Sequence, residues 1–124
     1  MKFKYSPHLT IYRFPLTALS SITNRITGFY LTGTFLGFGL LQWTPIKTVT
    51  VPFQYQKMWE SSLVFASSYH VFGGLRHFLW DFRPQHMSLA VGTWSSVAMF
   101  ASASIMTGAY ATLSKQKDFL DKKE

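Results

Sequence analysis

Residues 26–46 read ITGFYLTGTFLGFGLLQWTPI and contain no Asp, Glu, Lys or Arg. Residues 84–114 also lack these four residue types, and so does the shorter run 61–75. A helix needs roughly 20 mostly apolar residues to cross the hydrocarbon core of a bilayer. The first two stretches are long enough, whereas a span that includes residues 61–75 must accept polar side chains. The sequence therefore predicts an all-α integral membrane protein with three transmembrane helices.

The ends of these helices follow from prolines and polar residues. We predict three helices, at about residues 21–43, 56–82 and 87–113. They belong to a single membrane-anchor domain that covers residues 1–124. Residues 1–20 are expected to form an extended interfacial segment, in which a short helix could follow Pro15. Residues 114–124 are expected to form a solvated tail.

The composition fits a membrane location. Charged residues make up 14% of the chain, against about 25% in soluble domains. The net charge of +7 raises the alternative of nucleic-acid binding, but the uncharged runs leave no basic groove, so we expect no nucleic-acid partner. Because the chain contains no cysteine, a disulfide framework, a zinc finger and a thiolate nucleophile are excluded.

His70 is the most informative ionisable residue, because it lies within the second predicted helix. If Asp81 marks the membrane interface, a rise of about 1.5 Å per residue places His70 roughly 16 Å deeper. This is near the middle of a core about 30 Å thick. Ionisable residues at such a depth are functional candidates. Two interpretations stay open from this helix alone, namely a histidine hydrogen-bonded to a neighbour and a histidine that binds a haem iron.

The residues around His70 favour the haem interpretation. Gly73 and Gly74 follow it on the same helical face and leave room for a flat macrocycle. His77 continues this face toward the surface, with Arg76 beside it, where haem carboxylates would need donors. His77 is about 10 Å from His70 along the same helix and cannot reach the opposite face of one macrocycle. A six-coordinate iron would therefore need its second ligand from another chain.

The first predicted helix begins on the side of the membrane where the second one ends. Ser21 and Arg25 are four residues apart and share a face at this edge, where both can donate hydrogen bonds to a quinone. The alternative is that Arg25 extends to a lipid phosphate. Asp81 is expected in the same layer, where it could pair with an arginine or relay protons. Gly33 and Gly37 form a G-x-x-x-G spacing that permits close helix approach, unless it reflects chance in a glycine-rich span.

Three segments resemble the cytochrome b membrane-anchor subunit of succinate dehydrogenase, respiratory complex II. The first is SPHLTIY at residues 6–12, which is similar to the family's N-terminal segment. The second, SITNRITG at residues 21–28, is similar to the family pattern S-I-x-H-R-x-[ST]-G. The third runs from His70 to Asp81 and is similar to H-x-x-x-G-[IL]-R-H-x-x-W-D. The resemblance covers residues 6–82 well, and the third helix only by its length and character.

The resemblance implies an electron-transfer and anchoring subunit of succinate:ubiquinone oxidoreductase, with no succinate-oxidising site on this chain. It implies one haem b, shared with a second small membrane-anchor subunit, with His70 as the axial ligand from this chain. The other implied partners are a flavoprotein subunit, an iron–sulfur subunit and the lipid bilayer. The implied location is the mitochondrial inner membrane with the N-terminus on the matrix side, or a bacterial cytoplasmic membrane with the N-terminus cytoplasmic. The basic residues are divided evenly between the two sides and do not decide the orientation.

The resemblance also implies roles for individual residues. The implied residues near the haem are Asn24, Gly73, Gly74, Arg76 and His77. The implied residues of the ubiquinone site are Ser21, Ile22, Arg25 and Asp81. The family usually has histidine where this chain has Asn24, which can donate a hydrogen bond but carries no charge, so a propionate contact from the first helix is in question.

Three other functions are weighed beside this one. One is a purely structural anchor of the same complex, without haem ligation. Another is an ion or proton channel subunit, with His70, His77 and Asp81 as a relay. The third is an anchor of fumarate reductase, which differs in its quinone and in the direction of the reaction.

Overall fold

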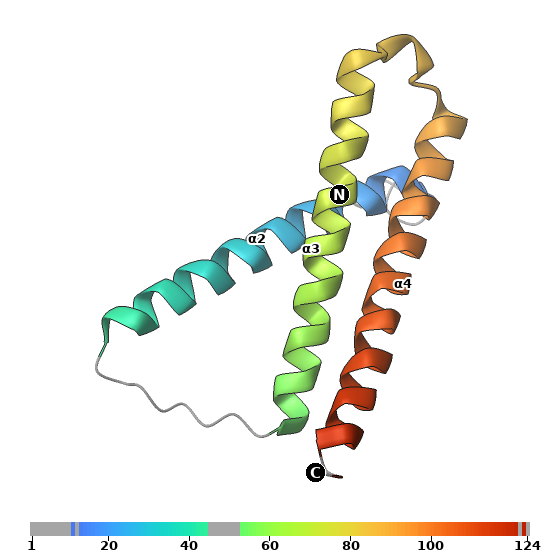
Figure 1. Ribbon diagram of the computed structural model, residues 1–124. Coiled ribbons are helices and arrows are strands. Elements are labelled where there is room, and N and C mark those ends of the chain that lie inside the picture. The colour runs from blue at the N-terminus through green and yellow to red at the C-terminus, as the bar shows by residue number, and fades with distance from the viewer. Residues whose placement is uncertain (1–10, 12, 45–52, 122, 124) are drawn as a thin grey trace, which may run out of the picture.

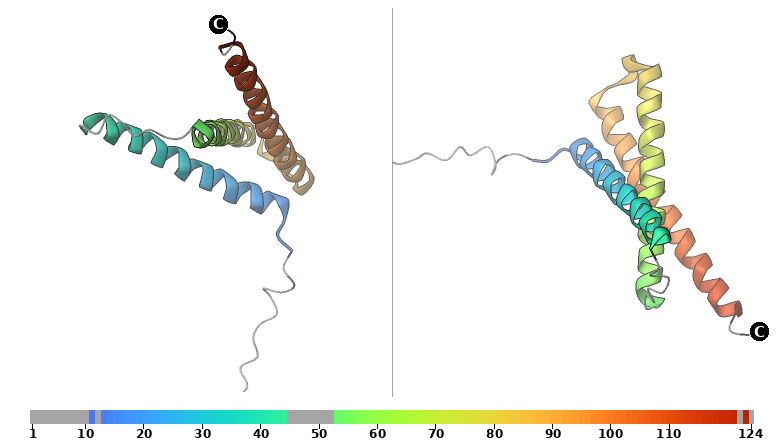
Figure 2. Two further views of the ribbon diagram at one scale, coloured as in Figure 1. Left: turned by 90° about the horizontal axis from the view of Figure 1, so that it is seen from below. Right: turned by 90° about the vertical axis from the view of Figure 1, so that its left-hand side faces the viewer.

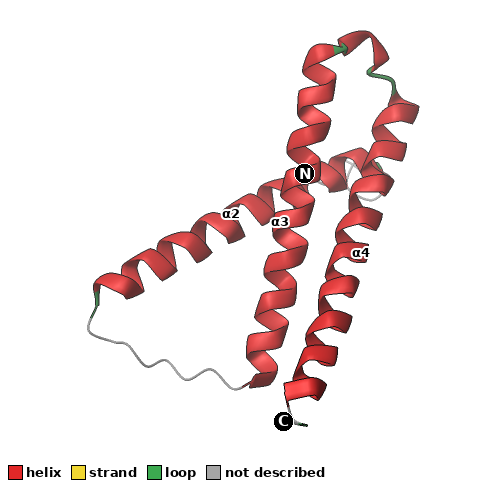
Figure 3. Cartoon of the chain, in the orientation of Figure 1, coloured by secondary structure: helices red, strands yellow, loops and turns green. Residues whose placement is uncertain are grey.

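The computed structural model describes residues 11, 13–44, 53–121 and 123. These residues form three long helices and one short 3-10 helix, with no strand among them (Figure 1, Figure 3). The elements are α2 (Leu16–Trp43), α3 (Phe53–Phe82), η1 (Pro84–His86) and α4 (Leu89–Asp121). The prediction of an all-α chain with three long helices is confirmed. The motif at residues 6–12 lies outside the described residues, apart from Ile11.

Helix α2 starts more than a turn before the predicted position at residue 21. Its cap is Pro15, whose carbonyl oxygen accepts hydrogen bonds from two amides of the first turn, at 3.0 and 3.2 Å. Proline has a fixed φ and lacks an amide hydrogen, so it suits the start of a helix. The helix ends at Trp43, where the amide and the hydroxyl of Thr44 both donate to the carbonyl oxygen of Leu41.

A tight turn reverses the chain between α3 and α4. The amide of Arg83 still donates to the carbonyl oxygen of Leu79, at 3.1 Å, and Pro84 then begins η1. The hydroxyl of Ser88 accepts a hydrogen bond from the amide of Val91 (3.3 Å) and so caps the start of α4. Helices α3 and α4 therefore form an antiparallel pair (Figure 1).

Helix α4 continues well past the predicted end at residue 113. It reaches Asp121, so the segment expected to be a tail is largely exposed but helical. The Nζ atom of Lys57 lies 3.3 Å from a carboxylate oxygen of Asp118, which ties this extension to the first turns of α3. The charged residues did not end the helix, because Lys and Gln are good helix formers.

Helix α2 crosses the α3–α4 pair near its own N-terminal end and then diverges, so that its C-terminal end stands apart from α4 (Figure 1, Figure 2). Two side-chain contacts still connect the outer part of α2 to α3. The hydroxyls of Tyr30 and Ser62 lie 2.6 Å apart, and the rings of Phe38 and Trp59 have centroids 5.3 Å apart. All three helices therefore meet only around the N-terminal half of α2.

The buried apolar core is small for a chain of this length. It consists of Ala66, Tyr69, Met99 and Ala103, with Phe65, Phe72 and Phe100 packed against it. Large apolar side chains are instead exposed along all three helices, including Phe29 at 82% and Phe35 at 74%. Such a surface is typical of helices that face lipid or other subunits.

Among the described helices, α4 alone has an 18-residue window apolar enough to cross a membrane by length and composition, with a mean hydropathy of 1.4. Only 22% of that window is buried inside the chain, which differs from the core helix of a soluble protein. Helices α2 and α3 have 28 and 30 residues. These lengths correspond to about 42 and 45 Å, which is more than the thickness of a hydrocarbon core.

Candidate functional site

The His70 side chain lies where α3 faces α2. Opposite it on α2 is Gly28, and a Cβ atom on that residue would lie 3.1 Å from Cε1 of the imidazole. The missing side chain thus lets the ring approach the α2 backbone. His70 is nevertheless exposed, and neither ring nitrogen has a hydrogen bond to another described residue. The imidazole is therefore free to bind a ligand.

A groove of about 570 Å³ opens beside this imidazole, and we call it the His70 groove. Its lining comes almost entirely from α2 and consists of Asn24, Arg25, Gly28, Phe29, Leu31, Thr32, Phe35 and His70. The lining combines one cationic side chain with aromatic and aliphatic ones. An apolar group that carries negative charge at one edge fits such a lining.

The two glycines after His70 have different surroundings. A Cβ atom at Gly73 would collide with the amide oxygen of Asn24 and lie 3.2 Å from Cε of Met99. At Gly74 nothing lies within 4 Å of that position. Residues three and four positions ahead lie on either side of His70 around a helix. Among the described residues, then, Gly74 has open space beside it, whereas Gly73 permits close packing of the helices.

A second cavity, of about 430 Å³, lies where the three helices meet, and we call it the polar cleft. It is lined by Thr17, Ala18, Ser20, Ser21, Asn24, Gly73, Arg76, His77, Trp80, Met87, Ser88, Leu89, Gly92 and Met99. It brings together five residues that the sequence analysis selected, namely Ser21, Asn24, Gly73, Arg76 and His77. Arg25 lines the His70 groove instead, and Asn24 lines both cavities.

A polar cluster of four side chains lies next to the polar cleft and consists of the buried Ser20, Tyr69 and Ser96 and the partly buried Arg76. Of these, Ser20 and Arg76 also line the cleft. The Tyr69 hydroxyl lies 2.9 Å from Oγ and 3.2 Å from the carbonyl oxygen of Ser20, and it donates to this residue. One guanidinium nitrogen of Arg76 donates to Oγ of both Ser20 and Ser96, each at 3.2 Å. The other donates to the carbonyl oxygen of Gly92, at 3.3 Å. The cluster joins α2, α3 and α4.

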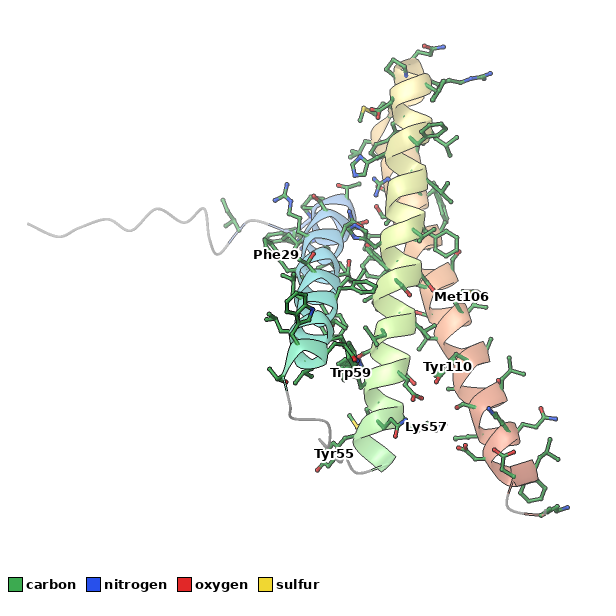
Figure 4. All side chains as sticks on the ribbon, turned by 60° about the vertical axis from the view of Figure 1, so that its left-hand side comes forward. Phe29, Tyr55, Lys57, Trp59, Met106 and Tyr110 are labelled. Atoms are coloured by element: carbon green, nitrogen blue, oxygen red, sulfur yellow. The ribbon has the colours of Figure 1, made fainter. Side chains whose placement is uncertain are left out.

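Two buried polar atoms at the polar cleft have no partner among the described residues. They are Oδ1 of Asn24 and Nε of Arg76, an acceptor and a donor. Buried polar atoms in folded proteins are normally hydrogen-bonded. A third such atom, Nε1 of Trp59, lies toward the other end of α3 (Figure 4). The first two atoms indicate that the polar cleft holds a polar ligand, water or part of another chain.

Two predicted quinone-site residues lie outside both cavities. Ile22 is 38% exposed, and Asp81 is exposed in the last turn of α3. Asp81 is one turn farther along the helix than His77, which packs edge-on against Trp80 with ring centroids 6.1 Å apart. Ser21 lines the polar cleft together with His77 and Trp80, the residue before Asp81, so the common layer of Ser21 and Asp81 stays a prediction.

The sequence analysis assigned no role to several residues that build the site. Ser20, Tyr69 and Ser96 are buried, with exposed fractions of 1%, 0% and 0%. Their neighbours in the sequence are other small or aromatic residues, so the sequence does not single them out. Gly28 was noticed only as part of a motif. The spacing of Gly92 and Ser96 could have indicated this site. They are four residues apart, so the backbone exposed at the glycine and the serine hydroxyl lie on one helical face, where both can accept hydrogen bonds.

The described residues contain no group of three or more His, Asp or Glu side chains that could hold a metal ion. A metal at His70 would thus need further ligands from a macrocycle or from another chain. Together with the apolar surface, this defines a class of protein: a helical membrane subunit with a candidate cofactor groove between two helices.

The family model for the succinate dehydrogenase/fumarate reductase transmembrane subunit matches residues 2–110. This chain belongs to that family and is an integral membrane protein. It is 36% identical over 87 residues to the succinate dehydrogenase cytochrome b556 subunit of Paracoccus denitrificans, covering 61% of this chain and 65% of that one. It is 30% identical over 118 residues to the mitochondrial succinate dehydrogenase cytochrome B subunit of Schizosaccharomyces pombe, covering 85% and 64%.

A third relative is the mitochondrial succinate dehydrogenase cytochrome b560 subunit of Mus musculus. The two sequences are 31% identical over 124 residues, which cover 87% of this chain and 69% of the relative. The chain thus spans just under two thirds of the length of the Paracoccus and Schizosaccharomyces proteins. The relatives come from both bacteria and mitochondria, and their names describe them as cytochrome b subunits.

Proposed function

We propose that this chain is the cytochrome b anchor subunit of succinate:ubiquinone oxidoreductase. In this role it supplies one axial ligand of a haem b, His70, and part of a ubiquinone site. The observation that carries the proposal is the imidazole of His70, exposed and without a hydrogen bond among the described residues, over Gly28 and beside a groove of about 570 Å³. Succinate itself would be oxidised on another subunit.

The residues of the His70 groove fit a haem in both shape and charge. Gly28 lets the imidazole approach α2, and Phe29 and Phe35 in the groove lining offer apolar contacts. Bound haem would supply one-electron chemistry, tuned by its axial ligands and its burial. His70 would provide one ligand of the iron, and the partner anchor subunit would provide the other.

Haem propionates would lie toward Asn24, Arg76 and His77. Asn24 lines both cavities, and His77 is exposed at the polar cleft. One terminal nitrogen of Arg76 donates to Ser20 and Ser96 and the other donates to Gly92, which leaves one N–H of the second nitrogen and the N–H of Nε without a partner among the described residues. A propionate role of Arg76 is therefore confined to these two donors.

Ser21 and Arg25 would hold the quinone head group. Ser21 lines the polar cleft and Arg25 the adjoining His70 groove, so a ring placed at their junction meets a hydroxyl donor and a guanidinium. The Ser21 hydroxyl would donate to one quinone oxygen. The positive charge of Arg25 would stabilise negative charge that develops on that oxygen during reduction. Ile22 and Asp81 lie outside both cavities, so they would act only through the iron–sulfur or partner anchor subunit.

The test is a His70→Ala variant of the assembled complex, with His77→Ala as the matched control. We expect His70→Ala to lower the haem-to-flavin ratio, measured by reduced-minus-oxidised absorbance, while some quinone reductase activity remains. His77→Ala should retain most of the haem. If His70→Ala retained full haem content, the ligand assignment would be wrong and the chain would be a structural anchor.

A further inference from the structure

Helix α2 has few apolar contacts that could fix its rotation. Its buried residues are Ser20 and Thr27, which are 1% and 6% exposed and seven positions apart on one face. Both are polar. The hydroxyl of Thr27 donates to a carbonyl oxygen of its own helix, 3.0 Å away, and so holds no neighbour. The side-chain hydrogen bonds that link the first half of α2 to other helices therefore converge on Ser20.

Arg76 is the centre of these hydrogen bonds. Its guanidinium reaches Ser20 on α2 and Ser96 on α4, while its stem belongs to α3. It also lies over the ring of Trp80, 4.0 Å from the centroid. A planar guanidinium can hold several acceptors in fixed directions, which an ammonium cannot do.

Gly92 permits this arrangement on the α4 side. A Cβ atom there would lie 3.2 Å from Cγ2 of Thr17, in the first turn of α2. The carbonyl oxygen of Gly92 accepts from Arg76 and also from Oγ of Ser96, at 2.8 Å. The start of α2, the start of α4 and the guanidinium are thus held in one place.

The rotation of α2 decides where its next residues point. Successive residues of a helix are about 100° apart around the axis. With Ser20 held inward, Ser21 faces the polar cleft and Arg25 faces the His70 groove. A rotation by one position would bury Ser21 and remove Arg25 from its groove.

We infer that Arg76, together with Tyr69 and Ser96, is a positioning residue that fixes the rotation of α2 through Ser20 and so aims Ser21 and Arg25 at the quinone. The inference rests on the proposed function. It assigns roles to Tyr69 and Ser96, which line neither the groove nor the junction where the quinone would bind, so their substitution can act only through this positioning.

The experiment uses Tyr69→Phe and Ser96→Ala variants of the assembled complex. We expect each to raise the KM for decylubiquinone by about threefold to tenfold, because each removes hydrogen bonds that hold Ser20 or Arg76 in place. Succinate oxidation with phenazine methosulfate should stay at the wild-type rate, so that the loss is confined to reduction of the quinone. Arg76→Lys should raise the KM at least as much, since a lysine cannot hold both serines.

The controls are Tyr30→Phe, which removes the other tyrosine hydroxyl between α2 and α3, and Ser104→Ala, at an exposed serine on the same helix as Ser96. Both should leave the KM unchanged. A KM that is unchanged in Tyr69→Phe and Ser96→Ala, or raised equally in the controls, overturns the inference. A wild-type complex that reduces no decylubiquinone would instead overturn the proposed function.

Discussion

At the scale of single residues, the site depends on the surroundings of its glycines: some lie against a neighbouring side chain, and others have empty space where a side chain would be. Gly28 and Gly73 lie against side chains of neighbouring helices, whereas Gly33, Gly74 and Gly108 have nothing within 4 Å of a Cβ position. The sequence shows all five only as glycines. A substitution at a packed glycine can therefore be compared with the same substitution at a glycine that has open space.

We expect Gly28→Ala to lower the haem content of the complex, and Gly28→Val to lower it further. The new side chain would push the imidazole away from α2, because a contact at 3.1 Å is too short for carbon atoms. The haem-to-flavin ratio measures this effect. Gly33→Ala in the same helix is the control, and an equal loss there would contradict the explanation.

Gly73→Ala should destabilise the complex, and Gly108→Ala should not. A methyl group at Gly73 collides with Asn24, and such overpacking costs about 1–3 kcal/mol. At Gly108 the methyl meets open space and improves helix propensity by up to about 1 kcal/mol. The thermal midpoint of the purified complex would reveal the difference. Equal midpoints for the two variants would mean that α2 does not pack on Gly73.

At the scale of elements, the two ends of the α3–α4 pair are held by different chemistry. One end has the turn and the polar cluster. The other end, where Lys57 and Tyr110 lie (Figure 4), has the ion pair to Asp118 and a 2.6 Å hydrogen bond from the Tyr110 hydroxyl to Glu60. The last turns of α4 depend on the second end.

We expect Asp118→Asn to increase amide hydrogen exchange in residues 115–121 without affecting haem content. The ion pair is partly exposed, so its contribution is small, about 0–1 kcal/mol, and it weakens with added salt. Asp121→Asn, at the end of the same helix, serves as the control. Exchange that is unchanged in Asp118→Asn would show that the helical extension does not need this contact.

At the scale of the whole molecule, the chain has little buried core and much exposed apolar surface. Helix α2 diverges from α4, the core is small, and aromatic side chains such as Phe35 and Trp94 are 74% and 73% exposed. A histidine on one helix can offer an iron only one ligand. Both features agree with the proposal that other chains complete the fold and the site.

We therefore predict that this chain, expressed without its partners and supplied with haem, gives a high-spin spectrum. His70 would occupy one axial position, and His77 is too far along the helix to occupy the other. Coexpression with the second anchor subunit should convert the spectrum to low-spin. A low-spin spectrum from this chain alone would contradict the shared ligation.

The sequence by itself determined the three helices and supplied the candidate residues. In lipid, the backbone N–H and C=O groups of a long uncharged run can form all their hydrogen bonds within a helix. It also selected His70 as a candidate ligand, which stays a prediction, because an ionisable group within an apolar span is costly without a function. Boundaries were less certain: Pro15 started α2 early, and charged residues did not end α4.

Only the tertiary structure decided how these residues are grouped. It placed Ser21 and Arg25 in two adjoining cavities and put the Asn24 side chain against Gly73. Asp81 lines neither of these cavities. It also turned Arg76 toward Ser20 and Ser96. These outcomes depend on the rotation and crossing of helices, which hydrophobic periodicity cannot define when apolar residues surround each helix. Contacts between particular side chains, which are far apart in sequence, fix them.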